Sequence, residues 1–265
     1  MKNADQCRAC RNGEGFDIPF TMAFQPIVDL SAGNIWGYEA LVRGPEGESA
    51  ASILSQVTEA TLYKFDQACR VRAIEMAGQL FQDDRTRLSI NFMPNAVYEP
   101  AACIRASLDA ARRVGFRREQ LMFEFTENER CTDPGHLNRI VTEYRRQGFM
   151  TALDDFGAGY ANMGLLANFQ PDLIKIDMLL IRNIDTDPVR QAIVASIINL
   201  ARTLGIRVIV EGVETEAELI VLRAAGATLA QGYFFAKPQI AALPSVSGFA
   251  SGPAATWSSD RLRAG

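Results

Sequence analysis

The stretch Gln147-Gly148-Phe149, followed by Thr151-Ala152-Leu153-Asp154-Asp155, decides the fold. A glycine just past the end of a helix takes up the left-handed conformation that stops the helix. The short apolar run that follows is typical of a strand buried on both faces. The stretch therefore predicts a helix, a glycine stop and a buried strand that ends in two acidic side chains.

The same unit recurs three more times, as Val114-Gly-Phe116 before Leu121-Met-Phe-Glu124, Leu204-Gly-Ile206 before Val208-Ile-Val-Glu211, and Ala225-Gly-Ala227 before Leu229-Ala-Gln231. Helices and strands thus alternate, which indicates parallel strands. The chain of 265 residues has the length of one (β/α)8 barrel, about 250 residues. Because such barrels carry their catalytic residues at the carboxyl ends of the strands, the pattern predicts a site as well as a fold.

The first two strands depart from this parallel pattern. Residues 22–30 are typical of a strand, Ser31-Ala-Gly-Asn34 of a turn, and residues 35–43 of a returning strand. A connection that short makes a hairpin, whose two strands are antiparallel. We therefore expect a modified TIM (β/α)8 barrel with an antiparallel first strand.

Other elements follow from local signals. Asp133-Pro134 and Asp187-Pro188 each supply an N-cap and a first-turn proline, so a helix is expected to begin at each proline. Alternation in Leu173-Ile-Lys-Ile-Asp177 predicts a strand with Lys175 and Asp177 on one face. We also expect helices over residues 50–59 and 62–80 and a strand over residues 88–92.

Composition limits the domain organisation and the class of protein. We expect residues 1–17 to form a flexible N-terminal arm, 18–240 the folded domain, and 241–265, rich in Ser, Gly, Ala and Pro, a poorly ordered tail. The chain shows neither a signal peptide nor an apolar run near the roughly 20 residues of a membrane span. Its net charge of −4 supplies no basic field for nucleic acid or an anionic membrane. These features predict a cytoplasmic protein without either partner.

The five cysteines are odd in number and scattered, which suits reduced thiols in a cytosolic protein. Cys7-x-x-Cys10 leaves two interpretations open: half of a zinc or redox site, or two spare thiols in a mobile arm.

Polar side chains stand at the end of nearly every predicted strand. In chain order they are Glu39, Asn91, Glu124, Glu127, Asp154, Asp155, Lys175, Glu211, Glu214 and Gln231. Carboxylates gathered at one mouth repel each other unless cations lie between them. Oxygen ligands favour Mg²⁺ or Mn²⁺, and the single histidine, His136, excludes a His-rich metal site.

Adjacent acids at the end of a strand, Asp154 and Asp155, are expected to point to different sides, where they could bridge two neighbouring metals or each serve one of them. Two metals suit phosphoester cleavage, because they clamp the attacking and leaving oxygens. A single acid such as Asp155 or Glu214 is as often a cap or a loop anchor. The repeated set of acids, an amide and Lys175 is what favours a functional site.

Motifs along the chain carry a family resemblance. They are Phe24-Gln-Pro-Ile-Val28, Glu39-Ala-Leu-Val-Arg43, Asn91-Phe-Met-Pro94, Glu124-Phe-Thr-Glu127, Asp154-Asp-Phe-Gly-Ala-Gly-Tyr160, Leu173-Ile-Lys-Ile-Asp177, Glu211-Gly-Val-Glu214 and Gln231-Gly232. In this order and spacing they resemble the EAL-domain family of cyclic-di-GMP phosphodiesterases. The resemblance implies a modified TIM barrel that hydrolyses cyclic-di-GMP to linear 5′-pGpG with two divalent cations, Mg²⁺ or Mn²⁺.

The resemblance also implies residue roles. Glu39, Asn91, Glu124 and Asp154 would hold one metal, and Asp154 with Asp155 the second. Lys175 would position the attacking water and Glu211 would act as its general base or orient it, so that Lys175, Glu211, Glu39 and Asp154 form the catalytic set. The substrate would be bound by Gln25 at a guanine, by Arg43 at the phosphate, and by Leu41, Asp177 and Gln231.

Two further residues would act on loops. Glu127 would anchor residues 156–162, a glycine-rich segment that is either a mobile lid or an ordinary connection, and Glu214 would steady the turn at Glu211. In the family this loop couples a dimer contact to metal binding, so a homodimer is expected, with a separate regulatory protein as one source of input. Two alternatives stay open: an inactive EAL domain that binds cyclic-di-GMP or a protein, and another metal-dependent TIM-barrel hydrolase.

Overall fold

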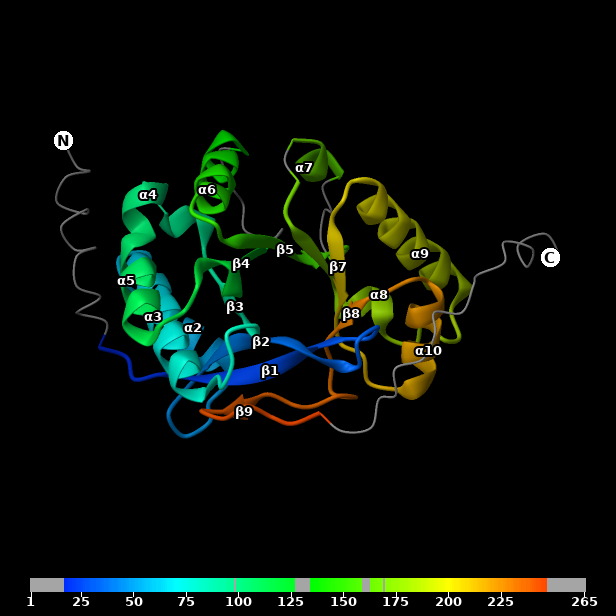
Figure 1. The fold of residues 1–265 in the computed structure, drawn as a ribbon, viewed down its shortest axis with the longest axis horizontal. Helices are drawn as coiled ribbons and strands as arrows, with labels where there is room; N and C mark the ends of the chain where they lie inside the picture. The colour runs from blue at the N-terminus through cyan, green and yellow to red at the C-terminus, as the bar shows by residue number, and fades with distance from the viewer. Residues whose placement is uncertain (1–16, 98, 127–133, 159–162, 169, 247–265) are drawn as a thin grey trace.

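The computed structural model describes residues 17–246 except 98, 127–133, 159–162 and 169. Its centre is a closed barrel (Figure 1). The strands are β1 Thr21–Asp29, β2 Asn34–Arg43, β3 Arg87–Asn91, β4 Leu121–Thr126, β5 Met150–Phe156, β6 Leu173–Ile176, β7 Arg207–Val210, β8 Leu229–Ala230 and β9 Gln239–Ile240.

Helices follow the parallel strands. They are α2 Ala50–Leu54, α3 Leu62–Leu80, α4 Pro100–Cys103, α5 Arg105–Val114, α6 Pro134–Arg146, α7 Met163–Asn168, α8 Met178–Ile181, α9 Pro188–Thr203 and α10 Glu216–Ala224, with short 3₁₀ turns η1 Pro94–Ala96 and η2 Arg118–Gln120. In Figure 1, α3 to α6 cover one side of the barrel and α7 to α10 cover the other. None of the helices that the described residues form has both the length and the hydropathy of a membrane span.

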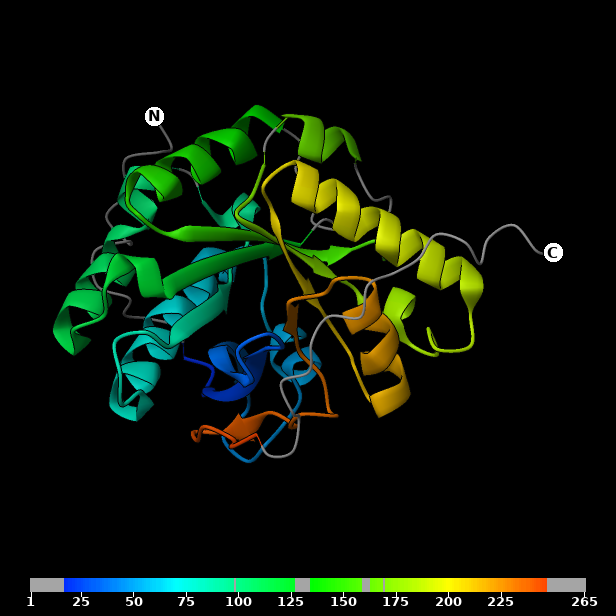
Figure 2. The same ribbon diagram turned by 45° about the vertical axis from the view of Figure 1, so that its right-hand side comes forward.

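The pairing of the strands confirms the modified barrel. Strands β2 to β8 are parallel neighbours, whereas β1 pairs antiparallel with β2 and with β8 and so closes the ring. Strand β9 pairs antiparallel with β1 and lies beside the hairpin (Figure 2). From there Ala241 N donates to Met22 O, and Tyr38 Oη donates to Pro244 O. The bounds assigned to the arm and the tail stay a prediction.

The glycine stops occur where the repeated unit predicts them. The four glycines of these units have φ between 72° and 95°, in the left-handed region: Gly115, Gly148, Gly205 and Gly226. The predicted cap of α9 is also present, since the Asp187 carboxylate accepts from Val189 N and Arg190 N. Several predicted bounds differ from the structure, most of the strand ends by one residue. Strand β6 ends one residue early because Asp177 caps α8, and α2 ends at Leu54 because the Thr58 and Thr61 side chains form a separate turn.

The barrel interior begins with an apolar floor at the amino ends of the parallel strands. The floor is a buried cluster of Ile27, Trp36, Met122, Ala152, Leu173, Ile209 and Leu229. The Trp36 ring lies between two guanidinium groups, with Arg87 Cζ 4.8 Å and Arg207 Cζ 5.1 Å from its centroid. Burial of seven apolar side chains and these cation–π contacts close the barrel at this end.

Candidate active site

A polar layer lies directly above the apolar floor. On five successive strands the residue two positions after a floor residue is polar, and these residues are Glu124, Asp154, Lys175, Glu211 and Gln231. Side chains two apart on a strand point to the same side. The same alternation that turns Met122 and Leu173 inward therefore turns Glu124 and Lys175 inward, one step nearer the mouth.

The Lys175 ammonium lies at the centre of this layer and is 1% exposed. Its Nζ is 2.8 Å from Glu124 Oε2 and 2.8 Å from Glu211 Oε1. It is also 3.0 Å from Asp154 Oδ1 and 3.5 Å from Glu39 Oε2. Four carboxylates from four different strands or strand ends thus converge on one buried cation.

Burial and charge shift the pKa values of this centre. Burial raises the pKa of Glu124 and of Glu211, the neighbouring carboxylates raise both further, and Lys175 offsets part of the rise. Burial alone would lower the pKa of Lys175, but the surrounding carboxylates raise it well above its ordinary value. The amine therefore stays protonated. Burial, with the charges of Asp154 and Asp177, raises the pKa of Asp155 to about 6.

The buried acids form two groups that share one member. Ligand oxygens of Glu39, Glu124 and Asp154 lie within 4.8 Å of one another, and so do those of Asp154, Asp155 and Glu211. The expectation that Asp154 and Asp155 point to different sides was wrong. The register of β5 shifts between Leu153 and Phe156, and Asp155 has a φ of 56°, so strict alternation fails there and both carboxylates join the same centre.

Side-chain amides order the Glu39 carboxylate on β2. Asn91 Nδ2 donates to Glu39 Oε1 at 2.9 Å, and Gln231 Nε2 donates to Glu39 Oε2 at 2.7 Å. Gln231 Nε2 also donates to Gln25 Oε1 at 3.1 Å, and Gln25 Nε2 donates to Ala236 O at 3.3 Å. The buried Gln231 Oε1 has no partner among the described residues.

Three residues expected to bind substrate lie nearer the outer rim. Leu41 and Arg43 follow Glu39 on the same strand at two-residue steps, and both are half-buried. Arg43 Nη1 donates to Val42 O at 2.7 Å. Asp177 accepts from Leu179 N at 2.7 Å and lies close enough to Asp155 to raise its pKa. Their roles at a substrate stay predictions.

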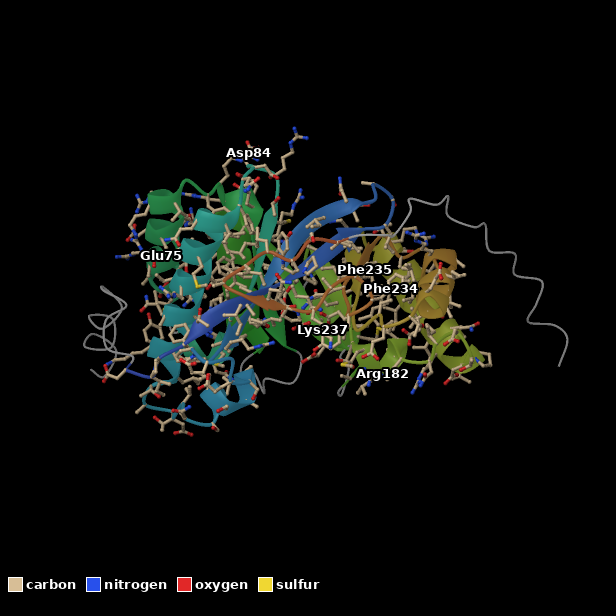
Figure 3. All side chains as sticks on the ribbon, turned by 90° about the horizontal axis from the view of Figure 1, so that it is seen from below. Glu75, Asp84, Arg182, Phe234, Phe235 and Lys237 are labelled. Atoms are coloured by element: carbon tan, nitrogen blue, oxygen red, sulfur yellow. The ribbon has the colours of Figure 1, made fainter. Side chains whose placement is uncertain are left out.

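The loop residues differ in what they contact. Glu127 and residues 159–162 of its predicted loop lie outside the described residues. Glu214 is exposed and pairs with Arg182 at the edge of the molecule (Figure 3). The turn after Glu211 is instead bound by Glu218, whose Oε2 accepts from Glu214 N at 2.9 Å and from Thr215 N at 3.0 Å. Its Oε1 accepts from Asn183 N at 2.9 Å.

Two residues of the site were missed at the level of sequence. Ser89 Oγ donates to Glu124 Oε1, and Ser89 is 1% exposed. Its position two residues before Asn91 on one strand was the available signal, because the two share a face. Glu218 closes the capping box Thr215-x-x-Glu218, a pattern that can be recognised from sequence.

Replacing Glu218 with alanine is expected to lower the free energy of unfolding by about 2 kcal/mol, because three backbone N–H groups lose their acceptor. Burial alone would raise the pKa of Glu218, but these donors lower it below 4.5. The difference in the free energy of unfolding between wild type and variant should therefore have its full size above pH about 4.5. It should shrink as the pH falls through the lowered pKa of Glu218. Urea unfolding measures it, with the exposed Glu216→Ala on the same helical turn as control. Equal losses in the two variants would contradict this role.

A closed barrel whose mouth gathers five carboxylates, four of them around one ammonium, defines a TIM-barrel protein with an acidic site that could hold a metal ion. The chain belongs to the EAL domain family, whose model matches residues 8–238. This match confirms the resemblance drawn from the motifs.

Solved structures agree with this assignment. The chain is 53% identical to a standalone versatile EAL protein from Vibrio cholerae O395, solved in its c-di-GMP-bound form, with a TM-score of 0.85 over 88% of this chain and 98% of that one. It is 35% identical to BlrP1 of Klebsiella pneumoniae in a manganese and cyclic-di-GMP complex, with a TM-score of 0.81 over 88% of this chain and 59% of that one.

Curated relatives include both enzymes and a regulator. The chain is 33% identical to the blue light- and temperature-regulated antirepressor BluF of Escherichia coli, over 85% of this chain and 56% of BluF. Several others are named cyclic di-GMP phosphodiesterases, among them RocR of Pseudomonas aeruginosa, 30% identical over 89% of this chain and 60% of RocR. The chain therefore spans little more than half the length of these two relatives.

Proposed function

We propose that this chain hydrolyses cyclic-di-GMP to linear 5′-pGpG with the help of two divalent cations, Mg²⁺ or Mn²⁺. One observation carries the proposal: the buried acids form two groups that share Asp154, with Lys175 between them. A shared carboxylate is what two neighbouring cations require. A cyclic-di-GMP-bound relative at 53% identity supports the choice of substrate.

The donor set fits such cations. The ligand atoms are carboxylate oxygens, supplemented by the amide of Asn91, and hard oxygen donors select Mg²⁺ or Mn²⁺. Five carboxylates and one ammonium leave four negative charges in a buried mouth, which two divalent cations neutralise. Glu39, Asn91, Glu124 and Asp154 would hold one cation, and Asp154 with Asp155 the other.

The reaction is an attack of water on one phosphorus atom. When bound, the cations polarise the phosphoryl oxygens and make water a better nucleophile. Glu211 accepts a proton from the attacking water, and Lys175, 2.8 Å from Glu211 Oε1, orients that carboxylate. The new P–O bond forms as the bond to the 3′ oxygen breaks, the 3′ oxygen takes a proton from solvent water, and Glu211 afterwards returns its proton to the solvent. Arg43, Gln25, Leu41, Asp177 and Gln231 would hold the phosphate and the bases.

Product chromatography tests the proposal directly. Incubation of the chain with cyclic-di-GMP and Mg²⁺ should yield 5′-pGpG, and omission of Mg²⁺ should prevent it. An inactive domain that binds cyclic-di-GMP or another protein is the second candidate, which the similarity to the antirepressor BluF favours. Tight binding of cyclic-di-GMP with no product in either metal would support that candidate. Cleavage of generic phosphodiesters in preference to cyclic-di-GMP would support a different hydrolase.

Further assignments belong to the same proposal. The protein acts in the cytoplasm as a homodimer, and Glu127 couples the dimer contact to the metal site through residues 156–162. A separate regulatory protein supplies the input. The family resemblance supports these assignments.

Activity is expected to depend on the identity of the cation. Mg²⁺ or Mn²⁺ should support turnover, whereas Ca²⁺ should bind and support at most about one hundredth of the rate. Calcium takes more ligands at longer distances, about 2.3–2.6 Å, so it would displace the attacking water from its position between the two acid groups. Initial rates in each metal, after removal of metal with a chelator, measure this. Equal rates in Ca²⁺ and Mg²⁺ would contradict the two-cation arrangement.

A further inference from the structure

A buried ion pair lies on α3, outside the barrel wall and apart from the acidic centre. Arg70 Nη2 is 2.8 Å from Asp66 Oδ2, and the two side chains are 0% and 2% exposed. Arg70 Nε also donates to Asp66 Oδ2 at 3.0 Å. Replacing such a pair with apolar side chains is often neutral for stability. Its presence therefore calls for a reason other than stability alone.

Each member of the pair reaches a different element. Asp66 Oδ1 accepts from Met93 N at 2.9 Å, in the segment that leaves β3. Arg70 Nη1 lies 3.4 Å from Cys103 O and 3.3 Å from Ser107 Oγ, where α4 meets α5. The guanidinium is thus fixed by two helices, and it fixes the carboxylate that holds Met93.

Met93 lies two residues past Asn91, at a point where the chain no longer pairs with β2 and is still bound to β4. The ladder between β2 and β3 ends with the pair of Ala40 and Ile90. On the other side β4 continues to hold the chain, because Asn91 pairs with Glu124 and Phe92 N donates to Glu124 O at 2.9 Å. On the β2 side, where the ladder no longer provides a backbone carbonyl, the Asp66 carboxylate accepts the hydrogen bond from Met93 N.

We propose that Asp66, held in place by Arg70, is a positioning residue for the metal ligand Asn91. The hydrogen bond from Met93 N fixes the backbone just beyond Asn91. That backbone sets the direction of the Asn91 amide, whose Nδ2 donates to Glu39 Oε1. The inference rests on the cation site of the proposed function and adds to it a residue on the outer side of the barrel.

Two double variants separate the hydrogen bond from the charges. Asp66→Asn/Arg70→Met removes both charges and keeps an acceptor for Met93 N. Asp66→Leu/Arg70→Met removes the charges and the acceptor. Binding of Mn²⁺ alone, followed by the electron paramagnetic resonance of the free ion without substrate, should be within about threefold of wild type in the first. It should be about tenfold weaker in the second, the size of effect typical of residues that orient a metal ligand.

The matched control replaces a second ion pair of α3, which joins α3 to α5. Arg113 of α5 pairs with Glu75 of α3, which Figure 3 labels, and both side chains are partly exposed. Glu75→Leu/Arg113→Met should leave Mn²⁺ affinity unchanged. Thermal unfolding of every variant shows that binding is measured on folded protein, and Asp66→Ala/Arg70→Met replaces the leucine variant if that one does not fold.

A mutant cycle that combines the double variant with Asn91→Ala tests whether the loss of Mn²⁺ affinity acts through Asn91. If Asp66 acts through Asn91, the loss caused by Asp66→Leu/Arg70→Met should vanish in the Asn91→Ala background, because the two changes remove the same ligand. An undiminished loss in that background, or equal Mn²⁺ affinity of both double variants, would overturn the inference. Wild type that binds Mn²⁺ without hydrolysing cyclic-di-GMP would overturn the proposed function alone. Wild type that binds no Mn²⁺ would overturn both.

Discussion

Replacing Asp154 with asparagine is expected to reduce hydrolysis of cyclic-di-GMP at least about 1,000-fold, which corresponds to about 4 kcal/mol in the activation free energy. Asp154 is the one carboxylate common to both groups of buried acids. Its loss weakens both cation positions together and also removes a partner 3.0 Å from Lys175.

Initial rates over a range of Mg²⁺ concentrations measure this effect. Asp84→Asn is the control for removal of one negative charge, because the Asp84 side chain is 72% exposed and distant from the mouth (Figure 3). Full activity of Asp154→Asn at high Mg²⁺ would mean that the carboxylate only adds affinity for the cation and is not required in the reaction.

Replacing Lys175 with methionine is expected to separate chemistry from cation binding. The rate should fall about 100- to 1,000-fold, the range found when one preorganised charged or donor group is lost from an active site. Affinity for Mn²⁺ should be equal or higher, because the ammonium contacts oxygens of Glu39, Glu124 and Asp154 that the cations would use. Parallel rate and binding measurements distinguish the two effects. A fall in affinity as large as the fall in rate would contradict the role assigned to Lys175.

Lys175→Met should also lower the stability of the metal-free protein. Without the ammonium, Glu124 is fully buried among like charges, and loss of one partner of a buried pair costs about 3 kcal/mol of unfolding free energy. Mg²⁺ should restore part of this loss in the variant and have less effect on wild type. Thermal unfolding with and without Mg²⁺ measures the difference. If the metal-free variant were as stable as wild type, the predicted cost would be contradicted. The carboxyl groups would then be protonated in the variant, because neutral groups need no cationic partner.

The sequence was most informative where one local rule fixes one local structure. Gly148 and its three counterparts stop helices because their φ must be positive, and the short turn after Asp29 forces β1 and β2 to be antiparallel. Alternation then turns Glu124 and Lys175 inward. The position of the acidic mouth therefore followed from spacing, and the family motifs added the roles of its members.

Other parts of the site depend on contacts between distant segments, and no local pattern predicts them. The bulge at Asp154 and Asp155 breaks the alternation that the sequence suggests, because Asp155 takes up a positive φ that only the folded barrel determines. Asp66 and Met93 are separated by 27 residues, and their hydrogen bond exists only because α3 packs over the exit of β3. A buried acid in a helix gives no sign in the sequence of the backbone group that it will bind.

The apolar floor determines the route by which substrate would enter the barrel and product would leave it. Trp36, in contact with Arg87 and Arg207, and six other buried apolar side chains fill the barrel at the amino ends of the strands, where such a barrel is a packed core and not a pore. The interior of the barrel is therefore reached from one end, the mouth at the carboxyl ends of the strands. Substrate and product would use the same mouth. Product that was slow to leave would delay the entry of the next substrate molecule.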